Sequence, residues 1–294
     1  SASFITIPAG KAIIGDPFFN KVSKTRPAKE VEIAEFKIGQ YPVTNEQFAN
    51  WLTDAFARGE VLWDLHHPGA IVNQEGFLLC HTNKANPLSQ IFFINESMHT
   101  QFLPITGKEN FPVIAVTWHG ANHYCKNNQC RLPTENEWEK AAGMSIDLKK
   151  RFKYGFGKNE INYRCANYRE QEAPVENIQV LTTKVGFYNG KHKLTLGTKE
   201  KKVVKTEDAK SPFGLYDISG NVWEWVDSYY LPHPGNPVTR AEYGKDKRVL
   251  KGGSWFDCLS YGCGLSAPTF NRSFFTPEVK NNSFGFRCAK TKSP

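Results

Sequence analysis

Signals for helices are confined to the first half of the chain, and this asymmetry limits the folds that the sequence can adopt. Thr44 and Gln47 stand three residues apart, as the hydroxyl and the reciprocating side chain of a capping box do. Thr134 and Glu137 repeat that spacing. We therefore predict one helix that begins after Thr44 and another that begins after Thr134.

Short strands and a further helix are predicted around these two starts. Apolar alternation in Phe4 to Ile7 and in Val31 to Ile38 predicts strands, and Val113 to Thr117 predicts another. Trp118 to Lys126 can then form a helix. Gly143 follows the apolar face of the helix after Thr134, so we expect it to end that helix as a left-handed C′ residue.

Beyond this point helical periodicity disappears, and Gly, Asn and Pro separate short aromatic segments. Helices early and irregular β structure late are typical of an α+β fold. Residues 57–110 alternate short apolar pieces with Pro, Asn and Gly, which indicates an irregular insertion. Because the sequence contains no linker and no repeat, we expect residues 1–294 to form one domain.

The formal charge of +8 raises the possibility of nucleic-acid binding, which requires clustered cations. The densest stretch, Lys191 to Lys205, mixes its lysines with Thr, Leu, Val and Glu, and predicts a solvated hairpin with one buried face. We therefore expect no nucleic-acid partner. No run of about 18 apolar residues predicts a transmembrane segment, and a signal sequence or lipid anchor, if there is one, lies outside this sequence.

Seven cysteines form an odd set without a CxxC pair or histidines at zinc-finger spacing: Cys80, Cys125, Cys130, Cys165, Cys258, Cys263 and Cys288. A structural zinc site is therefore not expected. A few disulfides and at least one remaining thiol fit this set better, and disulfides indicate an oxidising compartment.

Five blocks of sequence carry a resemblance to a known family. They are Tyr41–Asn45, Arg131–Trp138, Phe213–Trp225, Gly252–Trp255 and Phe284–Cys288, in this order along the chain. Together they resemble the formylglycine-generating-enzyme family, also called sulfatase-modifying factors. The resemblance implies a C-type lectin fold of that subtype, with two main helices and little regular secondary structure.

The resemblance also implies a disulfide between Cys125 and Cys288, which would tie the second helix to the last strand. Two buried thiols are the alternative, since structural cysteines are often buried and inert. A bridge that closes so long a loop would stabilise the fold by roughly 4 to 5 kcal/mol on the chain-entropy model. It would also place the protein outside the cytoplasm, and we expect it at the cell surface.

Glu224 lies between two tryptophans that we expect in the core, and a buried carboxylate needs a partner. Calcium is the partner that we predict. Asp217 and Glu224 offer carboxylate oxygens, and Gly220 and Val222 can offer backbone carbonyls. The resemblance implies the same four positions, because the family places a structural calcium at the matching residues.

Oxidases of this family hold copper with two cysteines that are five residues apart, as Cys258 and Cys263 are. Counted from Ser254, however, the family's two cysteines fall on Asp257 and Gly262, so the pair is displaced by one residue. A thiolate displaced in this way points elsewhere. We therefore expect no copper, and we keep a copper-dependent formylglycine-generating oxidase, which would act on a sulfatase cysteine, as the alternative function.

Residues 252–288 have a second interpretation. From Phe256 to Pro277 the chain contains no Lys, Glu, Gln, Met or Trp, and every residue used there can be encoded by a codon that ends in a pyrimidine. This composition is similar to the variable region of diversity-generating-retroelement proteins, in which asparagine codons are diversified on a C-type lectin scaffold. The flanking Gly252–Trp255 and Phe284–Arg287 are similar to those proteins as well.

Aromatic anchors beside small polar groups are typical of a binding loop. The predicted ligand contacts are Phe256, Asp257, Cys258, Ser260, Tyr261, Cys263, Phe270, Asn271, Phe274 and Phe275. Phe274 and Phe275 could instead complete the core under the loop. We predict a monomeric protein that binds another protein or a cell-surface molecule through this loop.

Overall fold

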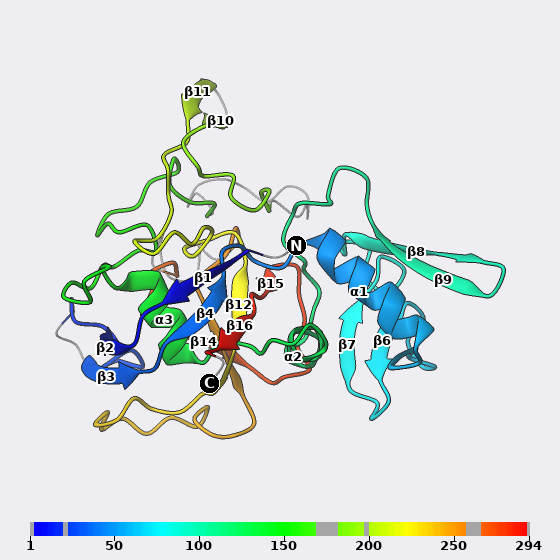
Figure 1. The fold of residues 1–294 in the computed structure, drawn as a ribbon, viewed down its shortest axis with the longest axis horizontal. Helices are drawn as coiled ribbons and strands as arrows, with labels where there is room; N and C mark the ends of the chain where they lie inside the picture. The colour runs from blue at the N-terminus through cyan, green and yellow to red at the C-terminus, as the bar shows by residue number, and fades with distance from the viewer. Residues whose placement is uncertain (1–2, 20–22, 169–181, 197–199, 257–265, 293–294) are drawn as a thin grey trace.

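The computed structural model describes residues 3–19, 23–168, 182–196, 200–256 and 266–292. Its described part contains the helices α1 (Asn45–Ala57), α2 (Trp118–Asn127) and α3 (Glu135–Gly143). This is one more than the two main helices that the resemblance implied, although all three lie where local sequence signals predict them. The fold is α+β, as predicted (Figure 1).

Both predicted capping boxes are present. Thr44 accepts a hydrogen bond from the backbone N–H of Gln47, and the Gln47 side chain accepts one from the N–H of Thr44. Thr134 and Glu137 make the same exchange at α3. Each box satisfies two backbone donors that the first turn of a helix leaves free.

Gly143 does not have the role that we predicted for it. It is the last residue of α3 and has no left-handed backbone, so it is not a C′ cap. A Cβ at this position would lie 1.5 Å from Nη1 of Arg151 and 2.8 Å from Oγ1 of Thr269. Glycine is needed here because a buried arginine passes close to the helix, which local sequence could not reveal.

The central sheet has the order β14-β13-β12-β15. Its strands are β12 (Trp223–Tyr229), β13 (Arg248–Lys251), β14 (Ser273–Phe275) and β15 (Phe284–Gly285). β12 pairs antiparallel with β13 and parallel with β15, and β13 pairs antiparallel with β14. A second sheet has the order β1-β4-β16, from β1 (Phe4–Ile7), β4 (Phe36–Gly39) and β16 (Ala289–Thr291). The two ends of the chain therefore meet in one sheet.

Two hairpins extend the fold. β2 (Gly10–Ile14) pairs with β3 (Lys29–Ile33), so the predicted strand from Val31 to Ile38 is in fact divided between β3 and β4. β10 (Lys193–Leu196) pairs with β11 (Lys202–Lys205) and forms the predicted lysine-rich hairpin. No side chain on these last two strands is fully buried, so the hairpin lacks the buried face that we expected.

The insertion at residues 57–110 is more regular than we predicted. It contains a three-stranded sheet of β5 (Val61–Trp63), β6 (Ala70–Asn73) and β7 (Leu78–His81), and a hairpin of β8 (Ile91–Glu96) and β9 (His99–Pro104). Of these strands, β5 and β9 lie beside α1, and β7 lies beside α2 (Figure 1). The predicted strand from Val113 to Thr117 is wrong, because Ala115 has a left-handed φ of 57° that interrupts it.

One core cluster joins the insertion to the central sheet. It includes Phe48 of α1, Phe102 of β9, Tyr124 of α2 and Trp225 of β12. Trp225 is fully buried, and its Nε1 donates to the carbonyl of Val116 over 3.1 Å. A second cluster packs α3 against the sheet of β1, β4 and β16. Among the described residues, no helix is long and apolar enough to cross a membrane.

The predicted disulfide between Cys125 and Cys288 is present, with Cα atoms 5.7 Å apart. It ties α2 to the segment just before β16 and closes a loop over a sequence separation of 163 residues. On the chain-entropy model such a loop corresponds to about 5 kcal/mol of stabilisation. Cys80 and Cys165 are buried thiols, and Cys130 is a half-buried one.

We predict that Cys125 and Cys288 stay unlabelled when the unreduced protein is unfolded in guanidinium and alkylated. Cys130 has no disulfide partner, so it should be labelled and serves as the internal control. Peptide masses should then show Cys125 and Cys288 linked. Labelling of both residues without reductant would contradict the disulfide and the oxidising compartment that follows from it.

Candidate ligand-binding surface

The predicted variable region begins at a sharp turn that only glycine can make. Gly252 and Gly253 follow β13 with φ values of +97° and +71°. A Cβ would lie 2.6 Å from the carbonyl oxygen of Ile218 at the first position and 3.0 Å from that of Ser266 at the second. The turn therefore brings the start of the region against Ser266, where the described chain resumes.

Trp255 secures the chain just after this turn. Its backbone N–H donates to Asn221 and its Nε1 donates to the carbonyl of Asn282, each over 3.0 Å. Phe256 comes next and packs against Trp255 with ring centroids 5.5 Å apart. Phe256 is 46% exposed, so it presents an aromatic ring to solvent at the start of the region.

Phe275 is also exposed, but it lies elsewhere. It stands opposite Arg248, at the end of β13 that is away from Gly252. Arg248 and Lys251, the two end residues of β13, are three residues apart, which corresponds to about 10 Å along an antiparallel strand. Phe256 and Phe275 therefore mark two ends of the predicted surface.

Three other predicted contacts face inward. Phe270 and Asn271 are buried, and Asn271 donates to the carbonyl of Ser266 over 3.1 Å. Phe274 is half-buried and stacks on Tyr230 with centroids 4.1 Å apart, which is the core role that the sequence left open for it. The remaining predicted contacts, Asp257, Cys258, Ser260, Tyr261 and Cys263, lie outside the described residues.

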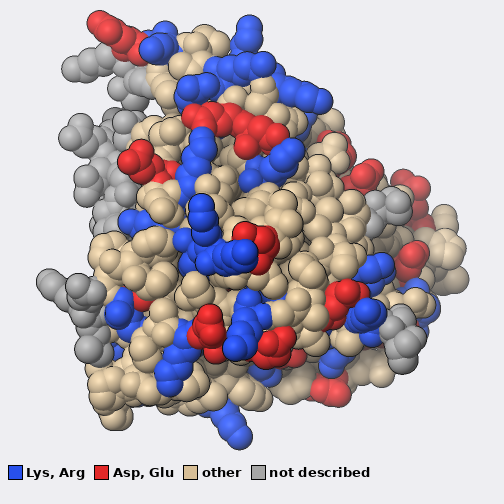
Figure 2. Space-filling view, turned by 60° about the vertical axis from the view of Figure 1, so that its left-hand side comes forward, with Lys and Arg blue, Asp and Glu red and all other residues tan. Residues whose placement is uncertain are grey.

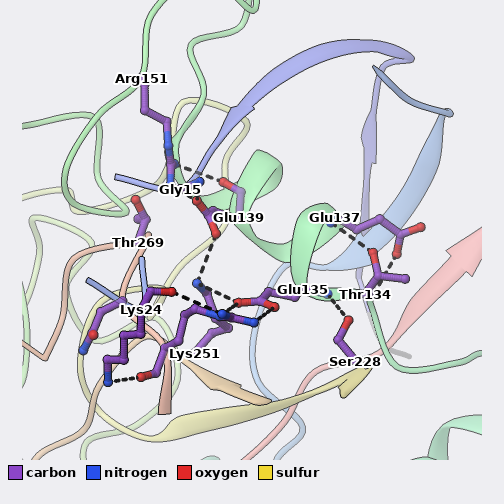
Figure 3. Close-up of polar contacts among 12 residues, drawn as sticks. Gly15, Lys24, Thr134, Glu135, Glu137, Glu139, Arg151, Ser228, Lys251 and Thr269 are labelled. Carbon is purple, nitrogen blue, oxygen red and sulfur yellow. Dashed lines mark hydrogen bonds and ion pairs between the residues drawn. The ribbon is translucent and has the colours of Figure 1, made fainter. Parts of the chain in front are cut away.

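A buried carboxylate on α3 holds the base of this region (Figure 3). Glu139 is fully buried and accepts hydrogen bonds from three other segments. The donors are the N–H of Gly15 at 2.6 Å, Nη2 of Arg151 at 2.8 Å and Nζ of Lys251 at 3.1 Å. Burial raises the pKa of the Glu139 carboxyl, but the charges of Lys251 and Arg151 outweigh it and hold that pKa at about 2.

A second carboxylate on the same face of α3, that of Glu135, holds the chain near the C-terminal end of the predicted loop. Glu135 receives two hydrogen bonds from Arg272, at 2.6 and 3.0 Å. Nζ of Lys24 donates to the carbonyl of Arg272, and Nη1 of Arg272 donates to the carbonyl of Lys24. Burial and the charges of Arg272 and Lys251 lower the pKa of Lys24 to about 8.

Lys251 precedes the predicted loop and Arg272 lies within it, three residues before Phe275, so α3 holds the chain close to both ends of the loop. No sequence motif predicted this buried charge cluster, which we define as Lys24, Glu135, Glu139, Arg151, Lys251 and Arg272. Glu135 and Glu139 lie four residues apart, on one face of a helix with Trp138. That spacing was the signal available, but their cationic partners are far away in sequence.

The predicted calcium position is built around a different ion pair. Glu224 accepts from Nε and Nη2 of Arg287 at 2.8 and 2.7 Å, and from Nε1 of Trp138 at 2.7 Å. Three motif blocks meet here. The need for a partner that led us to calcium is thus met by arginine, and Glu224 does not fit as a calcium ligand in this arrangement.

Asp217 fits that role better. It has a left-handed φ of 59° and accepts from the N–H of Gly186 over 2.7 Å. Burial raises the pKa of the Asp217 carboxyl to about 6, and the nearby charge of Arg287 compensates only in part. The described residues contain no group of three or more His, Cys, Asp and Glu placed to hold a metal. Calcium at Asp217 with the carbonyls of Gly220 and Val222 stays a prediction.

Other surface features lie apart from the loop. A hollow of about 640 Å³ opens beside the disulfide and is lined by residues such as Tyr41, Asn50 and Tyr124, but by none of the predicted contacts. Figure 2 shows positive and negative side chains interspersed over one face, with Lys and Arg gathered at the upper end, where β10 and β11 project in Figure 1. Glu207 pairs with Lys158 and Arg164 near that hairpin.

Comparisons with known proteins agree with the fold. A family model described as the sulfatase-modifying factor enzyme 1-like domain matches residues 1–292. Inactive C-alpha-formylglycine-generating enzyme 2 of Mus musculus is 29% identical over 297 residues, which cover 98% of this chain and 86% of that protein. Formylglycine-generating enzyme of Mus musculus is 29% identical over 317 residues, which cover 99% of this chain and 75% of that protein.

Two solved structures have a similar fold. Treponema denticola variable protein 1 matches with a TM-score of 0.56 at 20% identity and covers 98% of this chain and 94% of its own. CarF matches with a TM-score of 0.59 at 18% identity, covering 100% of this chain and 99% of its own. At these identities the likeness concerns the fold alone.

We predict that Glu139→Gln lowers the free energy of unfolding by about 3 to 5 kcal/mol, because it leaves Lys251 and Arg151 as buried cations without their carboxylate. Urea denaturation measures the change. The control is Glu60→Gln, which removes an exposed pair with Arg58 and should cost less than about 1 kcal/mol. Equal losses in the two variants would contradict the importance of the buried charge cluster.

A pH dependence follows from Asp217. The unfolded chain releases this proton near its usual pKa of 3.8, whereas the folded protein keeps it up to about pH 6. Between these values the folded state binds more protons, so stability falls as the pH rises. In EGTA, we predict that wild type loses about 2 kcal/mol of unfolding free energy relative to Asp217→Asn between pH 4 and pH 6, measured by urea denaturation.

Added calcium tests the metal prediction in the same two proteins. We predict that excess CaCl₂ raises the melting temperature of wild type above pH 6, where Asp217 is ionised, and leaves Asp217→Asn unchanged. The reason is that an ion bound only by the folded state stabilises it by mass action. A melting temperature that calcium does not change at any pH would rule out this site.

Proposed function

This chain belongs to the sulfatase-modifying factor enzyme 1-like family, and we propose that it uses the family's fold to bind a ligand and not to oxidise a cysteine. The ligand is another protein or a cell-surface molecule. The binding segment is the loop from Phe256 to Phe275, which follows the turn at Gly252, and Phe256 is the described contact at its start.

The observation that carries this proposal is the anchoring of the segment at both ends. Lys251 and Arg272 are tied to α3 by buried ion pairs, and Trp255 is held through its backbone and indole N–H groups. Lys251 and Trp255 precede the loop, whereas Arg272 lies within it, three residues before Phe275. The loop between them can therefore differ in sequence while its base stays in place, which is what a binding surface requires of its support.

Composition and a fold relative support the finer proposal that the loop is diversified. Residues 256–277 lack Lys, Glu, Gln, Met and Trp and combine aromatic with small polar residues, as binding loops do. Treponema denticola variable protein 1, which has a similar fold, is a variable protein by its own name. We propose that the loop of this chain is diversified by a retroelement.

The alternative is a copper-dependent oxidase, and the likeness to formylglycine-generating enzyme of Mus musculus favours it. The spacing of Cys258 and Cys263 favours it as well. Against it stands the displacement of this pair by one residue from the family's cysteine positions. A relative at the same identity is described as inactive, so the family's fold also occurs without the activity.

The location that we propose is the cell surface, outside the cytoplasm. The disulfide between Cys125 and Cys288 supports an oxidising compartment. We propose that the protein acts as a monomer and that calcium, where it binds, has a structural role.

We predict that the purified protein forms no formylglycine from a Cys-x-Pro-x-Arg peptide in the presence of copper and oxygen. The reason is that a displaced thiolate pair cannot hold copper in the geometry the family uses. Peptide mass spectrometry measures the product. The matched control is Cys258→Ser with Cys263→Ser, which should give the same background as wild type.

Turnover by wild type that this double variant lacks would overturn the binding proposal and restore the oxidase. Diversification has a separate test, which is to sequence sibling copies of the gene. Differences gathered at residues 256–277 support it, and differences spread evenly along the chain contradict it.

A further inference from the structure

Two phenylalanines outside the predicted loop are exposed side by side. Phe18 is 38% exposed and Phe19 is 46% exposed, in the segment that joins β2 to β3. Single exposed apolar residues are common on protein surfaces and need no explanation. Two adjacent exposed rings suggest a binding role when the backbone holds them in place, and the contacts of this turn do so.

The turn that presents them is fixed by buried groups. Asp16 is 3% exposed, and its Oδ1 accepts hydrogen bonds from the N–H groups of Phe18 and Phe19 at 2.8 and 3.2 Å. Gly15 has a φ of +92°, and a Cβ there would lie 2.9 Å from the carbonyl oxygens of Thr25 and Pro27. The N–H of Gly15 donates to Glu139, so this turn is tied to the buried charge cluster.

The two rings are continuous with the predicted binding segment. Phe270, which we predicted as a ligand contact, is 4% exposed because Phe18 and Phe19 pack against it. The ring centroids of Phe18 and Phe19 lie 6.0 and 6.4 Å from that of Phe270. The loop sequence predicted an exposed aromatic ring at Phe270. Phe18 and Phe19 cover Phe270 and present their own rings to solvent at this place instead.

A cation lies over this surface. Nζ of Lys153 lies 5.0 Å from the centroid of the Phe19 ring, and the backbone of Lys153 accepts from Thr269, next to Phe270. The carboxylate of Asp16 is buried and occupied by the turn, so it does not offset this cation at the surface. A partner that fits here combines apolar side chains with carboxylates.

We propose that Phe18 and Phe19 form a second, framework part of the ligand-binding surface, and that it takes an acidic segment of a protein partner with apolar or aromatic side chains. The inference rests on the proposed function and extends it, because these residues lie outside the loop. Such anchors are well suited to a binding surface, since their turn is rigid before the partner arrives. They supply affinity that does not depend on the sequence of the loop.

The test is a selection of random dodecapeptides displayed on phage against the whole protein. We expect the selected peptides to contain Asp or Glu together with aromatic or aliphatic residues. Synthetic versions should bind Phe18→Ser and Phe19→Ser about tenfold more weakly than wild type, as truncated interface anchors do. Lys153→Gln should weaken binding less at high salt than at low salt.

Phe77→Ser is the matched control. Phe77 is the same residue type and is 40% exposed, but it lies between β6 and β7 in the insertion. The Phe77→Ser protein should bind the peptides as tightly as wild type does. Melting temperatures of all variants confirm that the compared proteins are folded.

Phe256→Ser separates this inference from the proposed function. Peptides that lose binding with Phe256→Ser but bind Phe18→Ser and Phe19→Ser normally overturn the inference and leave the proposed function in place. Peptides that need none of the three residues, or a selection that enriches no binder, overturn both. A last experiment measures binding of the protein to vesicles of phosphatidylserine and phosphatidylcholine. Vesicle binding that requires Phe18 and Phe19 would contradict the proposed protein partner and indicate a membrane surface instead.

Discussion

The carboxylate of Glu139 is the contact on which the arrangement of the binding surface depends. One fully buried side chain accepts from Gly15, Arg151 and Lys251, which are far apart in sequence. A buried carboxylate is stable only with partners that compensate its charge, so the three segments that supply them have little freedom to move. Glu135, one turn earlier, adds Arg272 to the same face of α3. The turn before Phe18, the start of the loop and Arg272 near its end therefore all meet at this face of α3 and support one surface.

Local sequence signals predicted the helices correctly. The predictions that failed concern features that depend on contacts between segments far apart in the sequence. Capping boxes need only residues three apart, and both formed as expected. Gly143 was misread because the atom that requires a glycine belongs to Arg151, and the expected strand before α2 fails at Ala115. The resemblance, and not residue spacing, gave the pairing of Cys125 with Cys288.

The candidate site could be predicted only in part, for the same reason. Sequence showed that Glu224 needs a partner, but not that Arg287, 63 residues later, supplies one. Composition marked residues 256–277 as a binding segment without showing which side chains face solvent. Phe270 turned out to be covered by Phe18 and Phe19, which no motif includes. Binding surfaces built from separate segments are therefore recognised from contacts, after the fold is known.

Hydrogen–deuterium exchange on the whole protein, with and without a bound ligand peptide, tests the central claim most directly. The claim is that one supported surface, made of the turn before Phe18 and the loop after Gly252, binds the partner. It predicts slower amide exchange on binding in residues 15–19 and 252–275, and unchanged exchange in residues 41–50, which line the hollow beside the disulfide. Protection confined to residues 41–50, with none in the other two segments, would contradict it.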